Sequence, residues 1–147
     1  KATLPSKPEA IRLYTEGLAK LRVFDALTAR DLLEKTVAAD PEYPLAHSAL
    51  AVAWTNLGYD EKAKEEAKRA FDLSMKLSHE NRLAVEGRYL ETINERDKAI
   101  EIYRTLWNFF PDNLDYGLQL ASAQTAAGHG RDAQNTLEAL RKLPRPL

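Results

Sequence analysis

Four stretches of the sequence share one pattern of small, large apolar and turn-forming residues. Aligning "ADPEYP" with "FPDNLD", and "NLGYDEKA" with "AAGHGRDA", divides the chain into windows 10–43, 44–79, 80–113 and 114–147. Repeats of about 20 to 50 residues are typical of solenoids, in which each unit stacks on the next. Because one such unit cannot bury its apolar face alone, this periodicity constrains the fold more strongly than any other feature.

The pattern inside each window is helical. Apolar residues recur at spacings of three and four, as at Ile11, Tyr14, Leu18 and Leu21, and no stretch alternates as a strand does. Turn-forming residues interrupt these runs in "DPEYP", "NLGYDE", "FPDN" and "GHGR". We therefore expect an all-α fold of about eight short helices, two in each window.

Possible caps mark several helix ends. Ser6 precedes Glu9 by three residues and Asp112 precedes Asp115 by three, which is the capping-box spacing. These pairs predict helix starts near residues 7 and 113. In window 44–79 we expect Gly58 to reverse the chain and Asp60 to cap the following helix.

Small residues recur at equivalent places in the windows. Early in the second helices these are Ala29, Ala63, Ala99 and Ala133, and in the first helices they are Gly17, Ala51, Gly87 and Ala121. A glycine inside a helix costs about 1 kcal/mol relative to alanine. We therefore expect neighbouring helices to approach closely at these positions.

The spacing resembles the tetratricopeptide repeat, a helix–turn–helix unit with the pattern W-x2-L-G-x2-Y, then A-x3-F, then P. Window 80–113 carries the resemblance on Leu83, Gly87, Leu90, Ala99, Tyr103 and Pro111. Window 44–79 carries it on Leu50, Ala51, Trp54, Gly58, Ala63 and Ala70. The resemblance covers residues 10–147. It implies a right-handed superhelical solenoid of antiparallel helix pairs, with residues 1–147 forming a single domain.

Two windows depart from the family pattern. Gly117 stands where a large aromatic residue is usual, and window 44–79 lacks the closing proline and continues through "SMKLSHE". From the second departure we expect a longer second helix and a displaced junction. The stretch "KAIEIYRTLWNFFPDNLDYGLQLASAQTAAG" resembles repeats appended to bacterial serine/threonine protein kinases or winged-helix transcriptional regulators, which implies a regulatory domain.

Composition limits the possible partners and surroundings. The net charge is −1, so no global field recruits nucleic acid or anionic lipid, and zero cysteines leave the compartment undetermined by redox chemistry. No apolar run approaches the roughly 20 residues that span a bilayer. We expect a soluble chain without a nucleic-acid or membrane partner, with the cytoplasm slightly favoured. Since the sequence begins without Met, we expect a processed chain or a piece of a longer protein.

No motif in the sequence predicts catalysis. His47, His79 and His129 are scattered, without an i, i+4 pair or a neighbouring carboxylate arranged as a metal or base site. "GHGR" is interpreted as a turn rather than an anion-binding nest. No phosphate-binding loop, nucleophile elbow or pair of catalytic carboxylates is present. We expect no enzyme activity, no metal and no cofactor.

Two segments have alternative interpretations. "DEKAKEEAKR" is interpreted as a solvated helix face with i, i+4 pairs between Asp60 and Lys64 and between Glu65 and Arg69, and a charged docking surface is the alternative. "LWNFFP" is interpreted as core and junction packing, and an exposed contact patch is the alternative.

The family resemblance implies that the first helices line a concave groove for a peptide, a helix or a folded partner. The candidate partner-binding residues at these positions are Tyr14, Leu18, Arg22, Leu45, Ser48, Val52, Asn56, Asn81, Arg88, Glu91, Asp115, Gln119 and Ser122. The apolar first half of the groove suits hydrophobic anchors, and the second half suits polar contacts. Burial of Ile11, Leu18 and Val52 by neighbouring helices is the alternative. We expect Tyr14→Ala and Arg88→Ala to weaken binding with helicity nearly unchanged.

One known subtype of the family does not fit. Members that bind the carboxylate tails of heat-shock chaperones place Lys and Asn in the first unit, Asn in the second, and Lys and Arg in the third. The corresponding positions here hold Tyr14, Leu18, Ala49, Asn81 and Val85. Without those cations and amides, a terminal carboxylate would lose its charge-assisted hydrogen bonds.

The sequence thus predicts a non-enzymatic interaction module that binds a partner protein, a peptide or another domain of its parent chain. Two other functions remain open. A structural scaffold or homodimer would use Leu137, Leu140 or Leu143 of the last window, because "PRPL" supplies no capping helix. A small-molecule sensor would require a closed apolar pocket.

Overall fold

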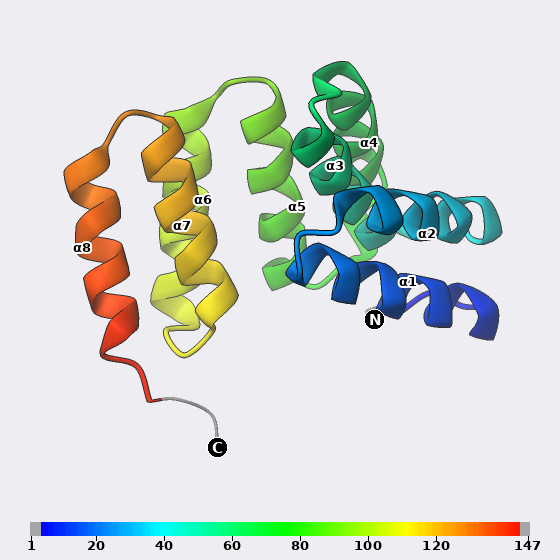
Figure 1. Cartoon of the computed structure of the whole chain (residues 1–147), viewed down its shortest axis with the longest axis horizontal. Coiled ribbons are helices and arrows are strands. Elements are labelled where there is room, and N and C mark those ends of the chain that lie inside the picture. Colours follow the sequence, from blue (N-terminus) through cyan, green and yellow to red (C-terminus); the bar gives the residue numbers. More distant parts are fainter. Residues whose placement is uncertain (1–3, 145–147) are drawn as a thin grey trace.

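The computed structural model describes residues 4–144, and all regular structure within that range is helical. Eight α-helices in this range follow one another as antiparallel pairs (Figure 1). The pairs are α1 (Pro8–Arg22) with α2 (Ala26–Ala39), α3 (Pro44–Leu57) with α4 (Asp60–Asp72), α5 (His79–Thr92) with α6 (Arg96–Phe109), and α7 (Leu114–Ala126) with α8 (Gly130–Arg141). The expected all-α architecture is confirmed. Residues 1–3 and 145–147 of the expected domain lie outside the described residues.

The turns inside the four pairs share one backbone conformation. Their left-handed residues are Phe24, Gly58, Asn94 and Gly128, with φ of 61°, 88°, 64° and 84°. In each turn, the N–H of the next residue donates to the carbonyl five residues earlier, as from Tyr59 to Trp54 at 2.9 Å. This hydrogen bond satisfies a carbonyl that the helix end would leave without a partner. The predicted reversal at Gly58 is confirmed.

The predicted caps are mostly wrong by one residue. Lys7 is the N-cap of α1 and makes no side-chain cap, because a lysine side chain has no acceptor. The amide and hydroxyl of Ser6 donate instead to Asp40. The helix starts were predicted correctly to within one residue, but Asn113 rather than Asp112 caps α7. Asp60 is the first residue of α4 rather than its cap. Its carboxylate lies in the first turn, where it interacts favourably with the helix dipole.

The junction between α4 and α5 contains a short 3₁₀ helix. We expected a longer second helix here, but α4 has 13 residues and ends at Asp72. The additional residues form η1 (Ser74–Lys76), in which the Ser74 hydroxyl donates to the carbonyl of Phe71. Ser78 then caps α5 by accepting from the amide of Asn81. The junction is therefore displaced, as expected, but by a tight turn rather than by helix extension.

Close helix approach at the small residues is confirmed. The alanines early in the second helices are at most 4% exposed. A Cβ built on Gly17 would lie 2.8 Å from Leu33, and one on Gly87 would lie 2.7 Å from Tyr103. Both distances are too short for carbon contacts, so a side chain of the partner helix fills the space that a larger residue would need.

The hydrophobic core has two main clusters and a small link. Leu33, Leu50 and Trp54 belong to the first cluster, which joins the first two helix pairs, and Tyr103 and Leu120 belong to the second, which joins the last two. Between them lies the cluster of Ala70, Leu77 and Val85, with Leu45 packed against it. None of the described helices is long and apolar enough to cross a membrane.

"LWNFFP" divides between the two interpretations. Leu106 is buried and Trp107 packs against the second core cluster, as expected for junction packing. Phe109 is 72% exposed and Phe110 is 41% exposed. The segment therefore supplies both core contacts and exposed aromatic surface.

Candidate functional site

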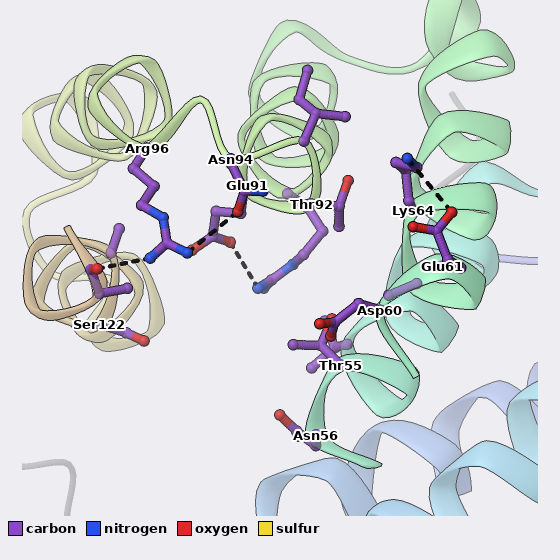
Figure 2. A pocket seen from close by; sticks show the side chains of 16 residues that line it. Thr55, Asn56, Asp60, Glu61, Lys64, Glu91, Thr92, Asn94, Arg96 and Ser122 are labelled. Atoms are coloured by element: carbon purple, nitrogen blue, oxygen red, sulfur yellow. Dashed lines mark hydrogen bonds and ion pairs between the residues drawn. The ribbon is translucent and has the colours of Figure 1, made fainter. Parts of the chain in front are cut away.

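An open pocket of about 610 Å³ lies where three helix pairs meet. Side chains from α3, α4, α5, α6 and α7 surround it (Figure 2). The ends of the first helices and the first turns of the second helices supply most of the lining, because the left-handed turns bring these segments together. The lining combines charged side chains with the neutral polar side chains of Thr55, Asn56, Thr92 and Ser122.

The charges around the pocket divide between two walls. The α4 wall carries Asp60, Glu61 and Lys64, and Lys64 Nζ lies 3.5 Å from Glu61 Oε1. The opposite wall, formed by α5, α6 and α7, carries Arg88, Arg96 and Glu91. Counting one charge for each group, the α4 wall is net negative by one and the opposite wall is net positive by one. A segment that crosses the pocket would therefore meet opposite charges at its two sides.

A half-buried network holds the Arg88 side chain. Glu91 Oε1 accepts from Arg88 Nη1 at 3.1 Å and from the Tyr103 hydroxyl at 2.8 Å. Burial raises the pKa of Tyr103, the positive charge of Arg88 opposes this shift, and the neighbouring Glu91 reinforces it. Burial by itself lowers the pKa of Arg88, but the interactions with Tyr103 and Glu91 outweigh it and the pKa is raised. The hydrogen bond to Glu91 therefore holds the Arg88 guanidinium at the pocket wall.

Arg96 connects two helix pairs at the same wall. Its Nη1 donates to the carbonyl of Ala126 at 2.7 Å, and its Nη2 donates to Asn94 Oδ1 at 3.3 Å (Figure 2). Ala126 is the last residue of α7, so the guanidinium neutralises the negative end of that helix. The contact keeps a second cation beside Ser122 and Arg88, which line the same pocket.

The structure brings together part of the predicted groove. The predicted residues that line the pocket are Val52, Asn56, Arg88, Glu91 and Ser122. Other predicted residues lie outside the pocket. The half-buried ones are Leu45, Ser48, Asn81 and Gln119, and the exposed ones are Arg22 and Asp115.

Tyr14 and Leu18 have structural rather than accessible positions. Tyr14 is 8% exposed and packs edge-on against Tyr43, with ring centroids 5.3 Å apart. Leu18 packs against the same core cluster. Of the expected apolar residues, Tyr14 is thus internal, whereas Leu18 and Leu45 are half-buried and Val52 lines the pocket. Tyr14→Ala should therefore reduce stability rather than leave helicity unchanged. Among the described first helices of the pairs, large exposed apolar side chains occur in α7, at Leu114 and Leu118.

Sequence reasoning missed the pocket residues that belong to second helices. Asp60, Glu61 and Arg96 lie in the first turns of α4 and α6, just after the left-handed turns, and Lys64 lies one turn further along α4. Asp60 and Lys64 had been assigned to a solvated face with an ion pair between them, but Lys64 pairs with Glu61. Arg69 approaches Glu42 at 3.6 Å rather than Glu65. The position of these residues directly after a turn is the signal that could have identified them.

The histidines do not assemble a metal site. His47 is buried, with Nδ1 2.7 Å from Glu66 Oε1 and Nε2 2.7 Å from the carbonyl of Pro41. This carboxylate neighbour was not anticipated, because Glu66 is 19 residues away in the sequence. Across residues 4–144, no group of three His, Cys, Asp or Glu side chains could hold a metal ion. His47 therefore ties α3 to α4 and to the preceding turn.

Comparisons with solved structures identify the fold. A tetratricopeptide repeat protein from Parabacteroides merdae matches with a TM-score of 0.63 and 13% identity over 93% of this chain and 53% of that one. The Sgt2 TPR domain from Aspergillus fumigatus matches with a TM-score of 0.53 and 20% identity over 100% and 90% of the two chains.

The first TPR of Spaghetti (RPAP3), bound to the HSP90 peptide SRMEEVD, matches with a TM-score of 0.55 and 20% identity over 82% of this chain and 96% of that one. No family model matches the sequence. The fold is tetratricopeptide-like, with consecutive antiparallel helix pairs.

Proposed function

We propose that the chain is a non-enzymatic interaction module that binds a segment of a partner protein, or of its own parent chain, in the pocket between α3–α4 and α5–α7. The observation that carries this proposal is the open pocket of about 610 Å³, lined by polar and charged side chains from three consecutive helix pairs. Rigid stacked pairs present such a surface without folding on binding, which lowers the entropic cost of association.

The pocket differs from one suited to a chaperone carboxylate tail. Of the positions that would supply its cations and amides, Tyr14, Ala49 and Val85 are buried. The pocket cations, Arg88 and Arg96, come from other positions and are accompanied by Glu91. An internal segment with side chains of both signs suits this arrangement better than a terminal carboxylate does.

Self-association has weaker support. Leu137 is 44% exposed, whereas Leu33, Ala67 and Tyr103, at the same place in the earlier windows, are 0% exposed. The remainder of that face of α8 is polar, and Leu140 is buried against Gly117. A mostly polar face offers a second copy little apolar surface to bury.

Two further functions have less support from the structure. A small-molecule sensor would require an enclosed apolar pocket, and the pocket here is open and charged. A regulatory role within a larger bacterial protein is supported by the sequence resemblance, and the compared structures add no link to kinases or transcriptional regulators.

Filling the pocket tests the proposal. Peptides selected from a displayed random library against the chain would be measured by calorimetry with Ser122→Trp, which places a large ring in the pocket from an exposed position. We expect binding to weaken at least about tenfold, since the segment must be displaced. Asn135→Trp, at an exposed position of α8 away from the pocket, is the matched control and should bind as the parent does. Equal affinity in both variants would remove the pocket as the binding site.

A further inference from the structure

One face of α7 carries a row of exposed residues that ends in the pocket. Leu114 is 50% exposed and Leu118 is 45% exposed, and Ser122, four residues further along, is an exposed pocket residue. At about 1.5 Å of rise per residue, consecutive members of this row lie about 6 Å apart along the helix axis. The other sides of α7 pack against its neighbours, with Gly117, Leu120 and Gln124 buried. The exposed face is therefore a continuous strip from apolar to polar surface.

The apolar part of the strip is specific to the last pair. Residues at the place of Leu118 in the earlier windows are Tyr14, which is buried, and Ser48 and Ala84, which are small. About half of the surface of each leucine remains in water, and that half contributes no hydrophobic stabilisation when the chain folds. Binding of an apolar side chain would remove the same surface from water.

The polar end of the strip meets a cationic wall. Arg88 and Arg96 line the pocket on the same side as Ser122, and Glu91 Oε1 is occupied by Arg88 and the Tyr103 hydroxyl. The opposite end carries Asp115, which is exposed on α7 next to Leu114. An acidic ligand residue is therefore attracted to the α5–α7 side of the pocket, and it is repelled by Asp115 at the apolar end and by Asp60 and Glu61 on the α4 wall.

We infer that the α7 strip and the pocket together bind an amphipathic peptide segment with two large aliphatic side chains followed, toward the pocket, by an acidic side chain. This inference rests on the proposed function and adds the class of partner. The aliphatic residues pack on Leu114 and Leu118, and the carboxylate pairs with the guanidinium groups of Arg88 and Arg96. The acidic residue of the segment lies at the pocket, where the charges are complementary, and the aliphatic residues lie on the adjoining leucines. This arrangement determines the direction in which the segment binds.

The probe is a displayed library of random 12-residue peptides, selected on the chain. The selected sequences should share two aliphatic positions and, on one side of them, an acidic position. Their alignment gives the number of residues between these positions. In calorimetry, Leu118→Ser should weaken a selected peptide about tenfold, because it removes a packing partner for an aliphatic side chain. Leu137→Ser, a leucine of almost equal exposure on α8, is the matched control and should leave affinity unchanged.

The acidic position is tested from the peptide side. Replacing the acidic residue of the peptide by Asn or Gln should weaken its binding to the parent chain about fivefold to tenfold. The same replacement should weaken binding to the Arg88→Gln variant by less than about twofold, because the partner of the carboxylate is already missing. If circular dichroism shows that Arg88→Gln is unfolded, the same comparison of peptides is made with Arg96→Gln, which changes an exposed position.

Two outcomes overturn the inference and leave the proposed function standing. In the first, the selected peptides are blocked by Ser122→Trp but lack the aliphatic pair. In the second, they bind Leu118→Ser and Leu137→Ser equally well. In either case the pocket binds a segment of different chemistry. Failure of every library peptide to bind, or binding that Ser122→Trp does not affect, would instead contradict the proposed function and the inference together.

Discussion

Phe24 combines an unfavourable backbone conformation with an exposed aromatic side chain. Its φ is 61°, a region that glycine adopts freely and bulky residues adopt at a cost of about 1 kcal/mol or more. Its side chain is 87% exposed, so packing does not compensate for that cost. Gly58 and Gly128 occupy the same turn position in other pairs, and Asn94, the fourth, is also of a type that tolerates this conformation.

Replacing Phe24 should therefore stabilise the chain. We expect Phe24→Gly to increase the free energy of unfolding by about 0.5–1 kcal/mol, since relief of backbone strain exceeds the added entropy of the unfolded state. Urea denaturation followed by circular dichroism measures this change.

Gly58→Ala is the reciprocal control. Nothing lies within 4 Å of a Cβ built on Gly58, so its φ of 88° is the dominant obstacle. We expect a loss of about 1 kcal/mol. A destabilised Phe24→Gly would show that the exposed ring makes contacts that outweigh the strain.

Some residue-scale features could be predicted from the sequence and others could not. Gly58 as a turn residue followed from its place after a helical run, because glycine favours a left-handed helix end. Phe24 and Asn94 at the same place could not be identified, since their side chains give no such signal. The family position of Tyr14 predicts a groove residue, but its burial depends on Tyr43, which lies between α2 and α3.

At the scale of helices, Gly117 shows how one pair compensates for a missing aromatic. A Cβ built on Gly117 would lie 3.0 Å from Trp107 and closer still to Leu140. Side chains from α6 and α8 therefore occupy the space that a large residue on α7 normally fills. Trp107 is further fixed by donation of its indole N–H to the carbonyl of Pro111 at 3.2 Å.

Gly117→Ala should consequently destabilise the last two pairs. The added methyl forces Leu140 or Trp107 to move, at a cost of about 1–3 kcal/mol, which exceeds the gain of about 1 kcal/mol in helix propensity. Thermal unfolding measures the change as a lower midpoint.

Gly130→Ala provides the comparison. Gly130 is the first residue of α8, and nothing lies within 4 Å of a Cβ built there. We expect its stability to be unchanged or slightly raised. A Gly117→Ala variant as stable as Gly130→Ala would show that α7 is not closely packed at this position.

Helix positions were more predictable than the contacts between helices. Periodicity located the elements because it repeats in every window. The 3₁₀ turn at Ser74–Lys76 could not be distinguished from a longer helix, since the same sequence pattern suits both. The exposed leucines of α7 likewise resemble core positions in the sequence, and only the absence of a covering helix among the described residues reveals their exposure.

Across the whole molecule, the two main core clusters are connected by the small group of Ala70, Leu77 and Val85. None of these three residues lines the pocket, which has α3 and α4 on one side and α5 to α7 on the other. The sequence predicted the stacking of pairs, because each pair must bury its apolar face. It could not predict the pocket, whose lining comes from three pairs that lie far apart in the sequence.

The most direct test of peptide binding in the pocket is amide chemical-shift mapping of the ¹⁵N-labelled chain with a library-selected peptide. We predict that the largest changes occur at Asn56, Arg88, Glu91 and Ser122, extending along α7 to Leu118, with small changes at Glu65 and Asn135 on other surfaces. Changes concentrated on α8 or on the exposed side of α4, with the pocket amides unmoved, would contradict peptide binding in the pocket.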